Sequence, residues 1–291
     1  LVGAVVILAL EKNPLEAYGN LLQGSGLWMK EKYAGGKSIL TDFFSFVDYW
    51  TPMIFAALAV AIALKAGLFN IGVSGQMLGA GFIASVTVGY STLSAPIAKS
   101  LVVLICLAVG SLLGGLIGYL KHKFNINEVV SSIMINYIVE YVTAFFIYLK
   151  FVDPVSRQSK NIVDSARLTF KNVPMGDVKA DIPLGIILAM IVTFVMKYVL
   201  DKTTFGYEIK AIGLNGHASK YAGMNVGKNI IIAMMISGGL SGLAGATYYL
   251  GYFGSIQPKV LASLGFDAIA ISLLGNSNPI GILASSFLIN I

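Results

Sequence analysis

The sequence predicts an all-α, polytopic helical membrane protein in which two helices are broken. Hydrophobic residues make up 56% of the 291 residues and charged residues only 12%, against about 25% charged in an ordinary soluble domain. Several apolar runs approach or exceed the roughly 18–20 residues that a helix needs to cross a bilayer. Two of these runs are interrupted by glycine residues and by residues with amide side chains. This pattern favours an internal structural repeat of the kind found in transporters.

The apolar runs predict one transmembrane domain over residues 1–291. The first run already begins at Leu1 and the last closes on Ile291 without a polar tail, so we expect both ends to be truncated. A short amphipathic helix is expected from Asn13-Pro14 to Leu22. The predicted spans are residues 1–10 (the tail of a span), 43–64, 76–93, 100–120, 128–149, 184–200 and 229–252, followed by an interrupted segment at 265–291.

Loop parity divides the charged segments between the two sides of the membrane. Lys65, residues 121–123 and section 201–228 fall on one side, and the polar segments 11–37 and 150–181 fall on the other. We expect the first side to be cytoplasmic because basic residues crowd its short loops. The net charge of +6 has the same origin, and the sequence lacks the basic stripe with interleaved aromatics that a nucleic-acid partner requires.

The stretch at residues 61–82, AIALKAGLFNIGVSGQMLGAGF, interrupts an apolar helix pattern with a polar, glycine-rich break. In hydrocarbon such a break is tolerated only where protein buries its backbone or water reaches it. Transporters place substrate contacts and moving joints at such breaks. The alternative is a tight turn between two spans at the membrane surface, and spacing alone does not choose between them. The break contains Gly67, Asn70, Gly72, Ser74, Gly75 and Gln76.

A polar stripe runs along the predicted fifth span. Glu128, Ser132, Asn136 and Glu140 follow one another at four-residue steps, and Thr143 comes next. This spacing places all five on one helical face. Glu140 lies near the middle of the span, where a carboxylate costs about 2.5–3.5 kcal/mol on insertion scales. We interpret the face as lining a transport path, and the alternative is a buried, hydrogen-bonded strut against a neighbouring helix.

Small residues at four-residue spacing predict two seams where helices pack closely, because short side chains let backbones approach in lipid. One seam lies in span 100–120 and the other in span 229–252. We interpret both as structural. The first consists of Gly110, Gly114 and Gly118, and the second of Ser237, Ser241 and Gly245, beside Gly238 and Gly242.

The last apolar segment carries a break of its own, GNSNPIG at residues 275–281. Residues 68–82 and 273–287 have equal length, and both begin with Leu, carry Leu at the eleventh place, then three small residues and Phe. A pair of Gly/Pro-broken segments in two halves indicates a transport site between structural repeats. Asn276 and Asn278 therefore join the candidate residues.

The sequence offers no recognisable catalytic centre. His122 and His217 are far apart and sit in predicted loops, without the spacing of metal ligands. Paired acids and an ATP-binding motif are also missing, so we expect a chain that is not an enzyme, with no catalytic residues, no metal and no cofactor of its own.

Two strings resemble a known family: NPLEAY at residues 13–18 and KAGLFNIGVSGQM at 65–77. They are similar to the permease subunits of bacterial ABC importers for nucleosides and simple sugars, within the larger branched-chain amino acid and ribose permease family. Residues 127–137, 213–223, 265–267 and 274–281 fit as well. The resemblance implies a multi-pass protein of the bacterial plasma membrane that forms the path for a nucleoside or related sugar. Ser74 departs from the pattern, since members commonly have Glu there.

The resemblance also implies partners. These are a second permease subunit, identical or different, two ATPase subunits that use ATP and Mg²⁺, and an extracytoplasmic substrate-binding protein. A coupling helix in the cytoplasmic section, 201–228, is expected to dock on the ATPase; section 201–228 is predicted to contain a short helix at 217–224. The alternative is an ordinary surface helix. The residues expected to couple are Asn215, His217, Ala218, Tyr221, Ala222 and Gly223.

The candidate path residues offer mostly neutral hydrogen bonding, which suits hydroxyl-rich or nucleobase solutes, and Phe69 or Tyr137 is able to stack on a base. The alternatives are a permease for branched-chain amino acids or ribose-like sugars, an ion-coupled secondary carrier and an intramembrane enzyme. A carrier usually embeds several ionisable residues, whereas Glu140 is the one clear mid-span case here. The path residues are Phe69, Asn70, Ser74, Gln76, Asn136, Glu140, Asn276 and Asn278.

Overall fold

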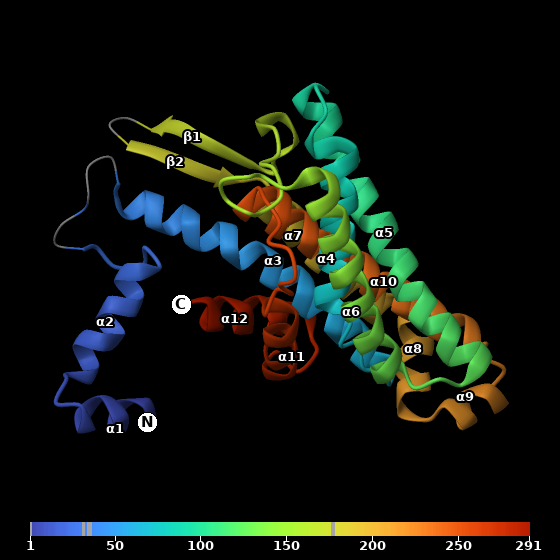
Figure 1. Ribbon diagram of the computed structural model, residues 1–291. Helices are drawn as coiled ribbons and strands as arrows, with labels where there is room; N and C mark the ends of the chain where they lie inside the picture. Colours follow the sequence, from blue (N-terminus) through green and yellow to red (C-terminus); the bar gives the residue numbers. More distant parts are fainter. Residues whose placement is uncertain (1, 31–32, 34–36, 176–177) are drawn as a thin grey trace.

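The computed structural model describes residues 2–30, 33, 37–175 and 178–291, and most of them are helical (Figure 1). The helices before the hairpin are α1 (Val2–Ala9), α2 (Pro14–Gly24), α3 (Ile39–Lys65), α4 (Val73–Ala84), α5 (Ala95–Phe124) and α6 (Glu128–Phe146). After it come α7 (Gly185–Lys202), α8 (Thr204–Leu214), α9 (Gly216–Tyr221), α10 (Val226–Thr247), α11 (Leu264–Leu274) and α12 (Pro279–Asn290). Short π-helical turns extend α4, α6 and α10 at η1 (Ser85–Gly89), η2 (Ile147–Phe151) and η4 (Tyr248–Phe253).

Among the described residues, four helices are long and apolar enough to cross a membrane: α3, α5, α6 with η2, and α10 with η4. They confirm the spans expected at 43–64, 100–120, 128–149 and 229–252. The span expected at 76–93 corresponds to α4 and η1, which begin earlier, at Val73, and end at Gly89. The fold is therefore the polytopic helical membrane fold that the composition predicts.

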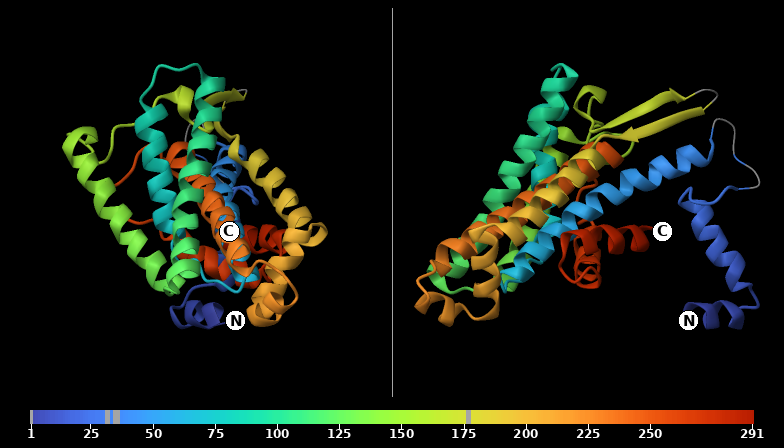
Figure 2. Two further views of the ribbon diagram at one scale, coloured as in Figure 1. Left: turned by 90° about the vertical axis from the view of Figure 1, so that its right-hand side faces the viewer. Right: turned by 180° about the vertical axis from the view of Figure 1, so that it is seen from behind.

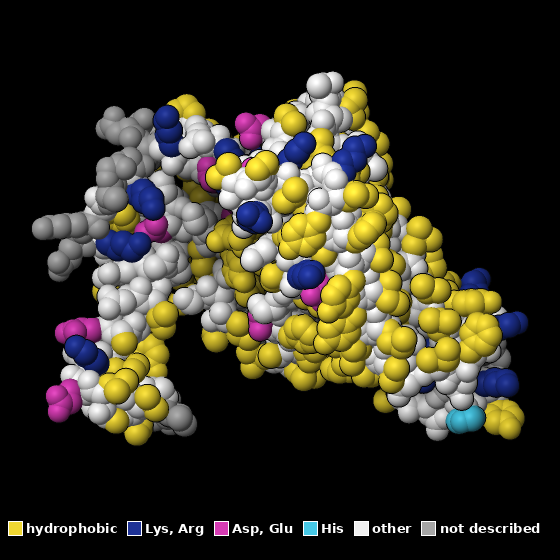
Figure 3. Space-filling model, in the orientation of Figure 1, with side chains coloured by type: hydrophobic (Ala, Val, Ile, Leu, Met, Phe, Trp, Pro, Cys, Tyr) yellow, Lys and Arg dark blue, Asp and Glu magenta, His cyan; other side chains and the backbone are white. Residues whose placement is uncertain are grey.

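Helix α3 is the centre of the bundle. Every residue from Ile54 to Ala63 is completely buried, because α10, α11, α12 and α7 pack around the helix. A helix that is apolar on all sides, as this segment is, belongs in such a position. Hydrophobic side chains also cover the outer face formed by α5 and α6 (Figure 3). Such an apolar face is compatible with contact to lipid.

The two small-residue seams pack against each other, as predicted for close helix contacts. A Cβ added at Gly110 would lie 2.2 Å from the carbonyl oxygen of Gly238, and one at Gly114 would lie 2.2 Å from that of Met234. Any side chain there would push α5 away from α10. The two seams therefore form the contact along which α5 and α10 run side by side (Figure 2).

The polar segment 150–181 contains structure that the sequence analysis did not anticipate. Strands β1 (Thr169–Met175) and β2 (Val178–Pro183) pair antiparallel, with a bulge between Phe170 and Val173. Buried Asp48 of α3 accepts a hydrogen bond from Thr169 Oγ1 at 2.8 Å, which fixes the hairpin to the bundle. The strands are short and their alternation is disturbed by the bulge, so periodicity gave little signal.

The three segments that parity assigned to the first side lie together at one end of the bundle, as predicted. Helices α8 and α9 lie at one end and the β-hairpin at the other (Figure 2). His122 packs on Gly227 beside α9, and Gly67 packs on Gly213 of α8, so the three segments assigned to one side do meet. Asn13 caps α2, accepting a hydrogen bond from the Leu15 N–H at 3.0 Å, as expected. The polar run at 30–37 lies mostly outside the described residues.

Candidate functional site

The break between α3 and α4 is held by a closed network of amide side chains. Asn70 Nδ2 donates to Gln76 Oε1 at 3.0 Å and to Ser237 Oγ at 2.9 Å. Asn70 Oδ1 in turn accepts from the Gly72 N–H at 2.9 Å and from Gln76 Nε2 at 3.3 Å. Ser237 Oγ donates onward to the carbonyl oxygen of Ala59 at 2.6 Å. Asn70, Gln76 and Ser237 are completely buried, so both donors and both lone pairs of Asn70 are used inside the protein.

Asn136 of α6 caps α4 from a neighbouring helix. The residue at the start of α4, Gly72, has no side chain to accept from the first N–H groups of the helix. Asn136 Oδ1 accepts from the Gly75 N–H at 2.9 Å, and Asn136 Nδ2 donates to the Ile71 carbonyl at 3.0 Å. Asn136 is only 3% exposed, and one amide therefore satisfies two backbone groups that the break leaves open.

Ser74 connects the break to the segment between η4 and α11. Its hydroxyl, completely buried, donates to the Ala262 carbonyl at 2.7 Å. A Cβ at Gly265 would lie 2.2 Å from Ser74 Oγ, so the first turn of α11 sits directly against α4. The position that differs from the family pattern thus makes a neutral hydrogen bond in a tightly packed place.

The residues of the predicted polar stripe lie on α6, and its Asn136 contacts the start of α4. Ser132, Asn136 and Thr143 are buried, whereas Glu140 is partly exposed. No hydrogen bond or ion pair holds the Glu140 carboxylate among the described residues. Glu128 forms an ion pair with Lys121, at 2.9 Å. Within this stripe, Asn136 has the contacts of a strut, and the Glu140 carboxylate is left without a partner among the described residues.

The second break differs from the first in its exposure. Asn276 and Ser277 adopt left-handed backbone conformations, with φ of 53° and 48°, and Asn278 Oδ1 caps α12 by accepting from the Ile280 N–H at 3.1 Å. Asn276 and Asn278 are exposed. Both breaks therefore have the helix–break–helix form that their pattern predicted, but the structure does not bring the amides of the second to those of the first.

The short helix expected within section 201–228 is present and lies at one end of the bundle (Figure 1). Helix α9 spans Gly216–Tyr221, so the expected range of 217–224 is wrong by one residue at its start and three at its end. It stops early because Gly223 adopts φ of 84°, a left-handed conformation that ends helices. Asn215 Oδ1 caps it by accepting from the Ala218 N–H at 3.0 Å.

The exposed residues in and around α9 are mostly small, with one aromatic and one large aliphatic side chain among them. Tyr221 is 94% exposed and Leu214, just before the helix, is 88% exposed. His217, Ala218, Ala222 and Gly223 are exposed as well. Sequence analysis did not predict α8, which packs against α9. Helix α8 also lies against the end of α3, because a Cβ at Gly213 would lie 2.4 Å from the Lys65 carbonyl oxygen.

The structure thus joins Asn70, Ser74, Gln76 and Asn136 into one buried cluster, and leaves Phe69 half-buried beside it. Sequence reasoning missed Ser237, because its small-residue spacing was assigned to packing alone. The signal for Ser237 was its hydroxyl in the middle of a span, because a polar group in hydrocarbon must find a hydrogen-bond partner within the protein. No group of three or more His, Cys, Asp or Glu side chains arranged to hold a metal occurs among the described residues.

Comparisons with known proteins agree with this architecture. The family model described as branched-chain amino acid transport system / permease component matches residues 43–291. Nucleoside ABC transporter permease protein NupB of Lactococcus lactis is 34% identical over 301 residues, covering 100% of this chain and 79% of that protein. NupC, a nucleoside permease of the same strain, is 28% identical over 255 residues, covering 82% and 77%.

Guanosine ABC transporter permease protein NupP of Bacillus subtilis is 40% identical over 242 residues, covering 82% of this chain and 69% of that protein. No solved structure matches the chain. The family match covers the central helix α3, both breaks and the α9 region. This chain is therefore an integral membrane protein that belongs to the family of branched-chain amino acid transport system permease components.

Proposed function

We propose that this chain is the permease subunit of an ATP-driven ABC importer of nucleosides in the bacterial plasma membrane. The observation that carries the proposal is the 34% identity to a nucleoside permease along the whole chain. Glu140 is the one mid-span carboxylate of the stripe, and it has no hydrogen-bond or ion-pair partner among the described residues, so an ion-coupled carrier, which usually embeds several ionisable groups, has little support.

Energy for transport comes, in this proposal, from a separate ATPase that binds ATP and Mg²⁺. The chain itself is non-catalytic and binds no cofactor. Helix α9 is the docking element, because Tyr221 and Leu214 expose large apolar surfaces on the side assigned to the cytoplasm. Ala218 and Ala222 lie four apart on the exposed helix end, and small side chains there let a partner approach closely.

The second permease is a different chain rather than a copy of this one. One Lactococcus strain has two nucleoside permeases that match, NupB at 34% identity and NupC at 28%. This chain is nearer to NupB, so its proposed partner is of the NupC kind. An extracytoplasmic substrate-binding protein delivers the nucleoside on the side of the β-hairpin.

The test is reconstitution of the complex with its ATPase and receptor in nanodiscs. Guanosine or uridine is expected to stimulate ATP hydrolysis when the receptor is present, and ribose or leucine is not. Stimulation by ribose or leucine alone would reassign the substrate, and transport driven by an ion gradient without ATP would overturn the importer proposal.

Docking is tested separately with variants of α9. Ala218→Arg or Gly223→Val is expected to uncouple nucleoside uptake from ATP hydrolysis, because the first adds bulk on the docking face and the second strains a left-handed residue. Val155→Arg, at the opposite end and 91% exposed, is the control for added charge. Normal ATPase co-purification and normal uptake in both α9 variants would make α9 a plain surface helix.

A further inference from the structure

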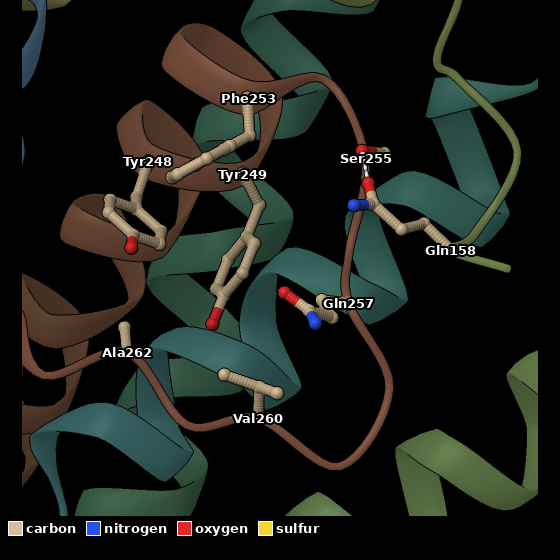
Figure 4. A pocket seen from close by; sticks show the side chains of 8 residues that line it. All are labelled: Gln158, Tyr248, Tyr249, Phe253, Ser255, Gln257, Val260 and Ala262. Carbon is tan, nitrogen blue, oxygen red and sulfur yellow. Dashed lines mark hydrogen bonds between the residues drawn. The ribbon is translucent and has the colours of Figure 1, made fainter. Parts of the chain in front are cut away.

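A partly open cavity lies where η4 meets the segment that leads to α11. Its enclosed part is small, about 80 Å³, below the roughly 300–1,000 Å³ of complete small-molecule sites, so it has room for only one part of a ligand. Figure 4 shows the rings of Tyr248, Tyr249 and Phe253 on one side and the amides of Gln158 and Gln257 on the other. The aromatic residues that sequence analysis considered for stacking, Phe69 and Tyr137, do not line it.

The rings owe their arrangement to the π-helical turn. Tyr248 packs edge-on against Tyr249 with centroids 5.0 Å apart, and against Phe253 with centroids 4.9 Å apart. The ring of Tyr249 is fixed from behind, since a Cβ at Gly81 would lie 2.7 Å from its Cδ2. Single π turns occur frequently at functional sites, and this one presents aromatic surface that is already ordered before any ligand arrives.

The polar groups of the cavity are neutral and several are free. Gln158 Oε1 accepts from Ser255 Oγ at 2.7 Å, and this bond turns the Gln158 amide nitrogen toward the cavity (Figure 4). The Tyr249 hydroxyl points into the same space beside Gln257 (Figure 4). Neither the Tyr249 hydroxyl nor the Gln257 amide has a hydrogen-bond partner among the described residues, and no charged side chain lines the cavity.

We propose that this cavity binds the heteroaromatic base of an uncharged nucleoside, as a subsite of the translocation path; the proposal rests on the proposed function. Aromatic rings bind bases of any sequence by stacking, and the free hydroxyl and amides offer the donors and acceptors that a base edge requires. The uncharged walls provide no partner for a phosphate, so the subsite selects nucleosides over nucleotides.

The position of the cavity fits a subsite at the receptor-facing end. Gln158 lies in the segment between η2 and β1, and this segment adjoins the β-hairpin at the end of the bundle opposite α9 (Figure 1). Ala262 forms part of the wall, and its carbonyl is the group that Ser74 binds. A base in the cavity therefore rests against a segment attached directly to the first turn of α4.

Photolabelling of the reconstituted complex tests the assignment. With receptor and ATPase present, 8-azidoguanosine is expected to label residues 248–262, and excess guanosine but not ribose is expected to prevent the labelling. Label confined to other segments, such as α6, would overturn the subsite.

Substitutions give a second, independent test. Tyr249→Phe removes only the hydroxyl and Gln257→Leu only the amide, so both variants are expected to fold. Each loses one neutral hydrogen bond, which predicts about two- to tenfold less labelling and guanosine uptake. Tyr141→Phe, on an exposed ring of α6, removes a hydroxyl elsewhere and is expected to change neither.

The outcomes separate this inference from the proposed function. If guanosine does not stimulate the wild-type complex, the proposed function fails. If guanosine is transported normally by the wild type and by both cavity variants, the importer stands and the subsite is wrong.

Discussion

Replacing Asn136 by Leu tests the cross-helix cap of α4 most directly. Leu has a similar volume but neither accepts from the Gly75 N–H nor donates to the Ile71 carbonyl. Asn136 is 3% exposed, so water does not replace the lost partners. Each unsatisfied buried group costs about 1–3 kcal/mol, and two such groups predict that the free energy of unfolding falls by about 2–6 kcal/mol.

The measurement is reversible unfolding of the purified protein in mixed detergent micelles, together with hydrogen exchange at the Gly75 amide. Exchange at Gly75 is expected to accelerate in Asn136→Leu. The control is Ser132→Ala on the same face of α6, because the Ser132 hydroxyl donates only to Val129 of its own helix, at 3.0 Å. Wild-type unfolding and exchange in Asn136→Leu would mean that packing alone holds the break.

Three further predictions concern other parts of the bundle. Gly114→Ala is expected to separate α5 from α10 and lower the thermal unfolding midpoint, whereas Gly115→Ala meets only the flexible side chain of Met235 and is expected to be tolerated; equal midpoints would contradict the seam. Glu140→Gln is expected to retain uptake and Glu140→Leu to lose more of it, and identical uptake in both would remove any role for hydrogen bonding there. Lys197 and Lys210 hold the pKa of Asp201 at about 2, beyond the predicted end of the span, so this contribution to stability is present above pH 4 and is lost as pH falls toward 2. Unfolding measured across that range is expected to depend less on pH in Asp201→Asn, and an unchanged profile would exclude the ion pairs as its cause.

Much of the fold could be predicted because membrane helices are encoded locally. An apolar run long enough to cross hydrocarbon has few alternatives to a helix, and the spacing of Gly110 and Gly114 marked the face on which α5 packs. Parity then placed the α9 region and the 121–123 segment at the same end. These inferences depend only on neighbours within a few turns of one helix.

The candidate site was less accessible because its partners are distant in sequence. Asn70 and Gln76 were recognised as unusual in an apolar run, but their partner Ser237 follows Asn70 by 167 residues. No local pattern states whether a buried amide faces a solute or another side chain. The cavity rings escaped notice for a related reason, since the π turn Tyr248–Phe253 departs from the 3.6-residue period by which helical faces are recognised.

The internal bonding of the first break explains how polar side chains persist at this depth. Every open amide group would cost free energy in hydrocarbon, so Asn70 and Asn136 close the break from within. The same segment contacts two other parts of the bundle: Gly67 packs on Gly213 of α8, and the Ser74 hydroxyl donates to the Ala262 carbonyl at the cavity wall. A shift of α8 changes the packing at Gly67 because the backbones are already in contact there. The break thus lies between α8 and the segment at the cavity wall and contacts both, and the hydrogen bonds of Asn70 and Asn136 that close it are complete without help from either.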